Sequence, residues 1–273
     1  MKKKVASFVL AAVMSLSVSA AVFANPIAGQ DYQGLVDVNG VNLYVDIQGS
    51  ANRDQTEPAV IFENGRLDEH TVWSAVQPVI AQTTQTLSYD RADIGQSDPG
   101  TGSYDAISQA QELHALLQEA NIAAPYVLVT HSHGSSITRV FADLYPTEVV
   151  GVAFIDAAHE DQEALITDTM PQALQDVYKS QFVKEGGYAA VLTGLAQAGA
   201  TVVNDPFRTI PIAVVSADDH RLGPVVEATW AALQAEIVTW SNFSTHTVAT
   251  GSYHFVMIDQ PQVVIDAIES LLY

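Results

Sequence analysis

Apolar and polar positions follow two different periods along this chain. Short apolar runs predict buried strands at residues 58–62, 127–129, 149–155 and 212–215, and residues 84–89 and 246–249 are also predicted to be strands. Apolar residues three and four positions apart predict helices at residues 107–120, 137–145, 225–240 and 261–272. Strands that alternate with helices predict an α/β fold class, with a mostly parallel central sheet flanked by helices.

Two regions depart from this alternation. Residues 32–46 alternate in the manner of a hairpin, with the Asn-Gly pair at 39–40 as its turn. Residues 159–208 contain helix-like segments at 172–182 and 188–198, which a glycine pair separates. We interpret this stretch as a small helical cap inserted between two strands of the sheet.

The first 24 residues have the composition of a secretory signal peptide. Met1 is followed by three lysines, residues 5–22 are apolar and rich in small side chains, and Ala24 offers a small residue for cleavage. A membrane anchor is the alternative, but the apolar run is short for a bilayer span of about 20 residues and contains serines. We therefore expect an exported protein, periplasmic or extracellular, with one domain at residues 25–273.

The charge balance is strongly acidic. The chain has 31 Asp and Glu against 11 Lys and Arg, a formal net charge of −20, and removal of the leader would delete three of the lysines. Nucleic acids and anionic lipid surfaces bind basic patches, so this balance argues against both as partners. The chain has no cysteine, which excludes thiol catalysis and zinc–thiolate sites.

The most specific candidate chemistry lies where a predicted strand meets a predicted helix. The strand at 127–129 leads into Thr130-His-Ser-His-Gly134, and helix-like spacing begins at Ile137. A strand, a sharp turn with a serine at its tip and a helix together form the arrangement called a nucleophile elbow. A serine hydroxyl is a weak nucleophile until a base and oxyanion-stabilising donors surround it, so the chain must supply both.

Four local patterns give the chain a resemblance to the α/β-hydrolase superfamily. They are Phe-Glu-Asn-Gly-Arg at 62–66, Tyr-Asp-Arg-Ala-Asp-Ile-Gly-Gln-Ser at 89–97, Thr-His-Ser-His-Gly at 130–134, and Ser-Tyr-His-Phe at 252–255 with Asp-Gln-Pro at 259–261. The resemblance covers residues 36–272 and implies the α/β-hydrolase fold with a small helical cap. Thr130 and Asp93 stand where this family usually has glycine.

The resemblance also implies functional roles for individual residues. Ser132 would be the nucleophile, and His254, between the last strand and the last helix, would be its base. The backbone N–H groups of His133 and Arg66 would form the oxyanion hole.

The acid of the implied triad stays open between two carboxylates. The family usually places it in the loop after the strand at 212–215, where its position falls on His220 and a one-residue shift would select Asp219. Asp156, at the end of the strand at 149–155, needs no shift, and we favour it.

Other polar residues beside the predicted site have structural interpretations. We expect the Arg66 side chain to pair with Asp68 or Glu69. We expect His131 and His133 to pack in the core or to line the pocket, since no further metal-ligand pattern accompanies them.

These features together predict an exported serine hydrolase. We expect a carboxylesterase that cleaves small or medium acyl esters through an acyl-enzyme, because the cap is short and the chain has no long apolar lid. This mechanism requires neither a cofactor nor a metal. The expected partner is a small-molecule ester, with no nucleic acid and no stable membrane association after leader cleavage, and the oligomeric state stays open.

Three alternative functions remain. Amide or peptide hydrolysis of the aminopeptidase type would need acidic cap residues to hold a substrate ammonium. Candidates for that role are Glu160, Asp161, Glu163 and Asp168. Lactone opening uses the same acyl chemistry. A non-catalytic binding protein on the same fold would be compatible with the two positions that depart from glycine.

Overall fold

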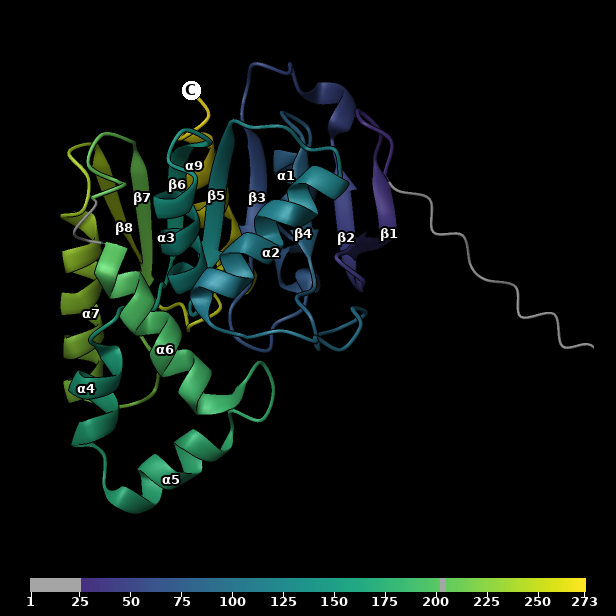
Figure 1. Ribbon diagram of the computed structural model, residues 1–273. Coiled ribbons are helices and arrows are strands. Elements are labelled where there is room, and N and C mark those ends of the chain that lie inside the picture. Colours follow the sequence, from purple (N-terminus) through teal and green to yellow (C-terminus); the bar gives the residue numbers. More distant parts are fainter. Residues whose placement is uncertain (1–25, 202–204) are drawn as a thin grey trace, which may run out of the picture.

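A computed structural model describes residues 26–201 and 205–273, and the expected leader at residues 1–24 lies outside them. Its centre is an eight-stranded sheet with the order β1-β2-β4-β3-β5-β6-β7-β8 (Figure 1). The strands are β1 (Tyr32–Val38), β2 (Val41–Gln48), β3 (Ala59–Glu63), β4 (Thr86–Tyr89), β5 (Tyr126–His131), β6 (Val149–Ile155), β7 (Ile212–Ala217) and β8 (Ser244–Ala249). β2 pairs antiparallel with β1 and β4, and the other neighbouring strands are parallel. The predicted α/β class with a mostly parallel sheet is confirmed.

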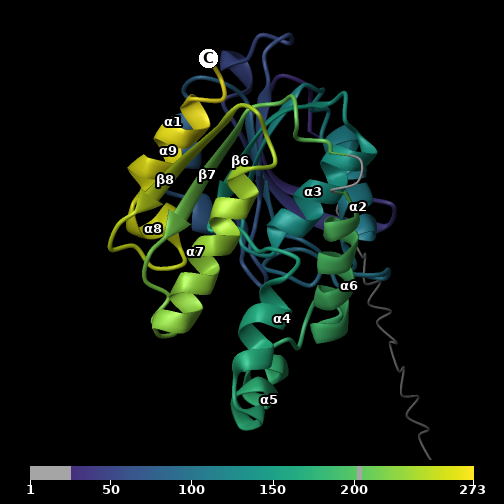
Figure 2. The ribbon, with the colours of Figure 1, turned by 90° about the vertical axis from the view of Figure 1, so that its left-hand side faces the viewer.

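Helices cover both faces of the sheet. They are α1 (Gln77–Ile80), α2 (Ala106–Glu119), α3 (Gly134–Leu144), α4 (Gln162–Ile166), α5 (Gln172–Ser180), α6 (Gly187–Ala200), α7 (Pro224–Val238), α8 (Val256–Asp259) and α9 (Pro261–Glu269). Figure 2 shows α1, α8 and α9 on one side of the sheet and α2, α3 and α6 on the other. Two buried apolar clusters match this division: one includes residues of α2, α3 and α7, and the other includes residues of α1, α8 and α9.

The elements form where the sequence pattern predicts them. Asn39 and Gly40 both have positive φ, as a tight Asn-Gly hairpin turn requires. All six residues of β5 are buried, because this strand lies between β3 and β6 in the middle of the sheet. The helix α2 begins after Asp105, whose carboxylate accepts hydrogen bonds from the backbone N–H groups of Ile107 and Ser108.

The connectivity of the sheet predicts where a site can form. β4 lies on one side of β3, whereas β5 to β8 follow on the other side. In open α/β sheets, ligands bind beyond the carboxyl ends of the strands at such a change of direction. The segments that leave β3, β5 and β6 therefore meet at one edge of the sheet.

The helices α4, α5 and α6 lie between β6 and β7 along the chain. Figure 1 shows α4 and α5 beyond one edge of the sheet, with α5 projecting farthest from the body. In the described part of the chain, neither these helices nor any other is long and apolar enough to cross a membrane.

Candidate active site

Ser132 lies at the tip of the turn between β5 and α3. Its φ is 49°, in the left-handed region that a serine seldom adopts. Two contacts with the end of β6 and the residues that follow it hold this conformation: the Ser132 N–H donates to the Ile155 carbonyl at 3.3 Å, and the Ser132 carbonyl accepts from the Ala158 N–H at 2.9 Å. A strained residue that its surroundings hold in place is a feature of functional sites.

The elbow packs closely against the loop that follows β3. A Cβ on Gly134, the first residue of α3, would lie 2.5 Å from the carbonyl oxygen of Asn64. A Cβ on Gly65 would lie 2.6 Å from Nδ1 of His131. Glycine is therefore required at both positions, because any side chain would separate the elbow from this loop.

The two departures from the family's glycines are compatible with these turns. Thr130 is buried within β5 and pairs with Glu63 and Phe154 of the neighbouring strands. Asp93 adopts a φ of 69°, and its carboxylate accepts a hydrogen bond from the Tyr104 hydroxyl. Neither substitution prevents the chain from making the local structure.

Asp156 and His254 form a close pair at the same edge of the sheet. Oδ2 of Asp156 lies 2.6 Å from Nδ1 of His254, and the carboxylate is fully buried. The other oxygen, Oδ1, accepts hydrogen bonds from the backbone N–H of Ala217 at 3.0 Å and from Nε1 of Trp230 at 2.9 Å. Burial raises the pKa of Asp156, but hydrogen bonds from His220 and His254 outweigh this effect and lower it. Asp156 is therefore ionised at neutral pH.

A second histidine contacts the same carboxylate. Nε2 of His220 lies 2.7 Å from Oδ2 of Asp156, and Nδ1 lies 2.7 Å from Oε2 of Glu227. Burial lowers the pKa of His220, but the two carboxylates raise it to about 9. Sequence reasoning placed His220 at the family's usual acid position and missed its contact with Asp156. The sequence feature that could have indicated a charged His220 is Glu227, an acidic residue seven positions later in the first turn of α7.

Asp219 is not part of this group of side chains. Its Oδ1 accepts a hydrogen bond from the backbone N–H of Arg221 at 3.0 Å, and the residue is exposed. Within the described residues, no hydrogen bond joins Asp219 to His254. Of the two carboxylates that the sequence left open, the structure brings Asp156 to His254.

The Ser132 hydroxyl and the two N–H groups expected in the oxyanion hole have no protein acceptor among residues 26–201 and 205–273. These N–H groups belong to the backbone of His133 and Arg66. Arg91 fixes the loop that carries Arg66. Its Nη1 and Nη2 donate hydrogen bonds to the carbonyls of Asn64 and Gly65 at 2.7 and 2.6 Å. Catalytic hydrogen bonds are often long in unliganded enzymes and shorten when substrate binds, so a free hydroxyl is compatible with a nucleophile.

Arg91 also joins this loop to the cap through a buried ion cluster. Its Nε lies 2.6 Å from Oε1 of Glu185, in the segment before α6, and its Nη1 lies 2.7 Å from Oε1 of Glu63. The Tyr89 hydroxyl donates to Glu63, and Oε2 of Glu185 accepts the Leu67 N–H at 2.9 Å. Burial raises the pKa of Glu63 more than Arg91 lowers it. Burial also raises the pKa of Glu185, but the charge and hydrogen bond of Arg91 outweigh burial and lower this pKa to about 2.

The expected pairing of the Arg66 side chain with Asp68 or Glu69 is wrong. The guanidinium instead donates to the backbone carbonyl of Lys184 and lies 4.7 Å from the centre of the Phe182 ring. The physical reason is that the segment of the cap before α6 packs against this loop and supplies these partners. Sequence proximity favoured a local partner, whereas the fold supplies one 118 residues away.

His131 and His133 occupy buried positions beside the elbow. Nε2 of His131 lies 3.0 Å from the carbonyl oxygen of His254, and Nδ1 lies 3.3 Å from Asp68. Burial and the nearby His254 lower the pKa of His131, which Asp68 only partly opposes. Burial lowers the pKa of His133 to about 4, against the opposing effect of Glu185. Both imidazoles are therefore neutral at pH 7.

One group of side chains in the described ranges has the donor types and spacing of a metal site. It consists of Asp156, His220 and His254, with ligand-type atoms within 4.8 Å of one another. Two nitrogens already contact one carboxylate oxygen at 2.6 and 2.7 Å. These are lengths of direct charge-assisted hydrogen bonds, shorter than the spacing of two ligands around an ion such as zinc. We interpret the group as a hydrogen-bond network.

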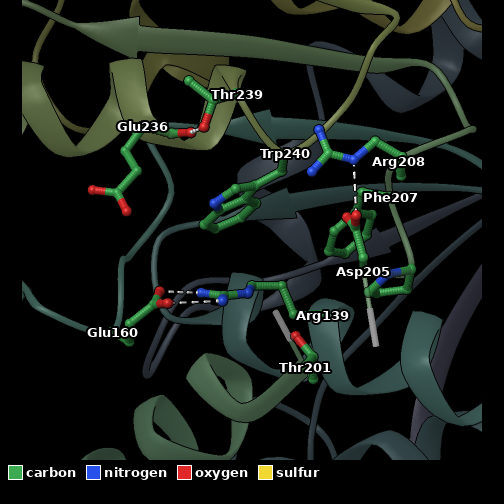
Figure 3. A pocket seen from close by; sticks show the side chains of 10 residues that line it. Arg139, Glu160, Thr201, Asp205, Phe207, Arg208, Glu236, Thr239 and Trp240 are labelled. Atoms are coloured by element: carbon green, nitrogen blue, oxygen red, sulfur yellow. Dashed lines mark hydrogen bonds and ion pairs between the residues drawn. The ribbon is translucent and has the colours of Figure 1, made fainter. Parts of the chain in front are cut away.

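A separate cavity of about 240 Å³ lies near α3, α6 and α7 (Figure 3). The buried Arg139 guanidinium donates to both carboxylate oxygens of Glu160 and lies 4.1 Å from the centre of the Trp240 ring. None of the residues that line this cavity belongs to the Ser132–His254–Asp156 group. Its polar side chains are largely engaged with one another, and we assign it no part in the chemistry described below.

The fold and the family comparison agree on the class of this protein. A family model described as the alpha/beta hydrolase fold matches residues 58–187, a range that includes the elbow and the loop after β3. Solved structures of that fold superpose on most of the chain. The chain has the α/β-hydrolase fold, and over residues 58–187 it matches the model of that family.

Individual relatives are similar over most of the chain. An uncharacterized protein, YqjL, of Bacillus subtilis (strain 168) is 27% identical over 205 residues, which are 75% of this chain and 79% of the relative. The crystal structure of Cfl2 from Burkholderia cenocepacia has a TM-score of 0.63 at 20% identity, and covers 88% of this chain and 95% of that one. A thermophilic esterase from Thermogutta terrifontis has a TM-score of 0.63 at 15% identity, and covers 88% of this chain and 97% of that one. At these identities the two structures support a shared fold alone.

Proposed function

We propose that the protein is a serine hydrolase that cleaves small or medium acyl esters by acyl transfer. The observation that carries the proposal is the position of Ser132. It lies on a strained turn whose backbone is bonded to the segment containing Asp156, while the preceding His131 contacts the backbone of His254. A serine, an imidazole and a buried ionised carboxylate on neighbouring segments are the elements of a catalytic triad.

In the proposed reaction, Ser132 attacks the ester carbonyl carbon and His254 takes the hydroxyl proton at Nε2. Asp156 accepts the N–H of Nδ1, which fixes the tautomer and stabilises the imidazolium. The N–H groups of His133 and Arg66 donate to the oxyanion of the tetrahedral intermediate. His254 then returns the proton to the leaving alcohol, and a water activated by His254 releases the acid and regenerates Ser132.

Aminopeptidase-type chemistry is a weaker candidate, because two of the four acidic cap residues already have partners. Glu163 is buried and accepts hydrogen bonds from the hydroxyls of Tyr178 and Tyr188. Glu160 is paired with Arg139. A carboxylate with a fixed partner is poorly suited to bind a substrate ammonium, so esters remain the preferred substrate class.

The test is hydrolysis of a substrate panel by the wild-type protein and by Ser132→Ala. The panel contains p-nitrophenyl esters of increasing acyl length, a γ-lactone and amino-acid p-nitroanilides. We expect short esters to be hydrolysed fastest, and Ser132→Ala to lose about 10⁴–10⁶-fold in kcat while it keeps the wild-type circular dichroism spectrum. Activity of the variant near the wild-type level would contradict the proposal. Exclusive turnover of the anilides would instead favour amide hydrolysis, and exclusive turnover of the lactone would favour lactone opening.

We also propose that the protein is exported with cleavage of residues 1–24. The support is the basic start, the apolar run and the small residue at position 24. The intact mass of the protein recovered from the periplasm or medium of an expressing bacterium should correspond to a chain that begins at Asn25. Retention of the full leader in a membrane fraction would contradict this proposal.

A further inference from the structure

Asp156 has four donors around its two oxygens, and one of them is not needed for a triad. Oδ1 accepts from a backbone N–H and from an indole, and Oδ2 accepts from both His254 and His220. His254 alone would complete the proposed triad. The second imidazole on Oδ2 therefore calls for an explanation.

The contacts of His220 determine its charge. Its Nε2 faces Oδ2 of Asp156 and its Nδ1 faces Oε2 of Glu227, each at 2.7 Å. A neutral imidazole can donate from only one nitrogen, whereas both carboxylates can only accept when ionised. Both short contacts are hydrogen bonds only if His220 is an imidazolium. Glu227 is itself oriented, since its Oε1 accepts the backbone N–H of His220 at 2.9 Å.

Three titratable groups of the described residues contact His220 or lie beside its ring. The titratable groups that face it are Asp156 after β6, Glu227 on α7 and His254 after β8, whose ring centre is 5.8 Å away. The guanidinium of the neighbouring Arg221 is turned onto the ring of Tyr253, 3.7 Å from its centre. The cationic charge of His220 is therefore matched by two carboxylates, one of which it shares with His254.

We propose that His220 is a positioning residue that acts through Asp156. Clamped by Glu227, it fixes the direction of the carboxylate lone pair that receives His254, and its positive charge opposes protonation of His254. Two cations sharing one carboxylate repel each other, so the charge of His220 disfavours the imidazolium form of His254. This inference rests on the proposed function for its catalytic consequence, but not for its prediction about charge.

The test combines NMR titration of the histidine side chains with pH profiles of kcat/KM. Both use the full chain, as wild type, His220→Gln and Glu227→Gln. The matched control is His114→Gln, because His114 also faces a carboxylate, Glu148 at 3.2 Å, but lies on α2 away from the site.

In the wild type we expect His220 to remain an imidazolium at pH 7.5. In His220→Gln, His254 should take up its proton about one pH unit higher than in the wild type, because the opposing charge is gone. The acid limb of kcat/KM should move upward by the same amount. Glu227→Gln should let His220 lose its proton at lower pH and should therefore move the His254 titration upward, as in His220→Gln, while His114→Gln should change neither readout.

Three results would overturn the inference. One is a neutral His220 in the wild type at pH 7.5, and the second is a His254 titration that is the same in wild type and His220→Gln. If His220→Gln does not fold, an unchanged His220 titration in Glu227→Gln is the third. If the wild type hydrolyses no member of the panel, the proposed function fails, and the NMR titrations still decide whether His220 acts on His254.

Discussion

Two networks of charged side chains flank Ser132, and they differ in whether their charges can change. The acid-side network lies after β6, β7 and β8 and consists of Asp156, His220, Glu227, Trp230 and His254. The cap-anchoring network lies under the loop after β3 and consists of Glu63, Tyr89, Arg91 and Glu185.

Exposure separates the two networks. In the acid-side network the His254 side chain is 30% exposed while Asp156 is fully buried, so protons can reach the His254 imidazole. In the cap-anchoring network the side chains of Arg91, Glu63 and Glu185 are at most 2% exposed. The comparison indicates two different roles: protonation can change beside the proposed base, whereas the geometry is fixed beside the proposed oxyanion hole.

The largest effect is expected from the acid itself. Asp156→Asn should lower kcat by about 10⁴-fold, because an amide no longer selects the productive tautomer of His254. Asp219→Asn is the matched control and should stay close to wild-type activity, since that carboxylate is exposed and bonded to its own loop. A large loss in Asp219→Asn with an active Asp156→Asn would reverse the assignment of the acid.

The cap-anchoring network should respond in stability rather than in protonation. Arg91→Met leaves two buried carboxylates without their cation, and we expect the free energy of unfolding to fall by about 3–5 kcal/mol. Arg208→Gln breaks an exposed pair with Asp205 and should cost no more than about 1 kcal/mol. Urea denaturation of both variants measures the difference. Equal losses in the free energy of unfolding would show that the buried cluster stabilises the fold no more than an exposed ion pair does.

A milder change to the same network tests the link between cap and loop. Glu185→Gln keeps the shape of the side chain but removes its charge, so we expect a loss of about 1–3 kcal/mol in the free energy of unfolding. Because the Leu67 N–H also loses a charged acceptor, kcat should fall while the pH profile keeps its wild-type position. A shifted acid limb in this variant would mean that the two networks are coupled.

The smallest expected effect is a pH dependence of stability from His220. Its pKa is raised from 6.5 in the unfolded chain to about 9 in the folded protein. The stabilisation is therefore complete below about pH 6.5 and is lost as the pH rises through 9. Thermal unfolding between pH 6 and 10 should show this decline in the wild type and a weaker one in His220→Gln. The same slope in both proteins would contradict the assigned charge.

Much of the fold could be predicted from the sequence, because the central strands β3, β5, β6 and β7 contain apolar runs. β6 lies at the predicted residues, and β5 and β7 extend beyond the predicted residues by two or three positions. The short helices α1, α4 and α8 were not predicted. They have only four or five residues each, which is too short for a helical period to be recognised.

The candidate site was predictable only where one segment carries the information. Ser132 could be located from its strand–turn–helix context, and His254 from a local pattern before the last helix. The choice between Asp156 and Asp219 depends on the conformation of the loop after β7, where His220 rather than an acid faces the site. Partners far apart in sequence could not be found: Arg91 and Glu185 are 94 residues apart, and no local pattern connects them.

The most direct test of the central claim is the intact mass of the purified protein before and after treatment with a fluorophosphonate, with peptide mapping of any adduct. The account predicts a single adduct on Ser132 in the wild type and in Ser135→Ala, and no adduct in Ser132→Ala. A folded wild-type protein that remains unlabelled, or an adduct on another residue, would contradict the assignment of Ser132 as an activated nucleophile.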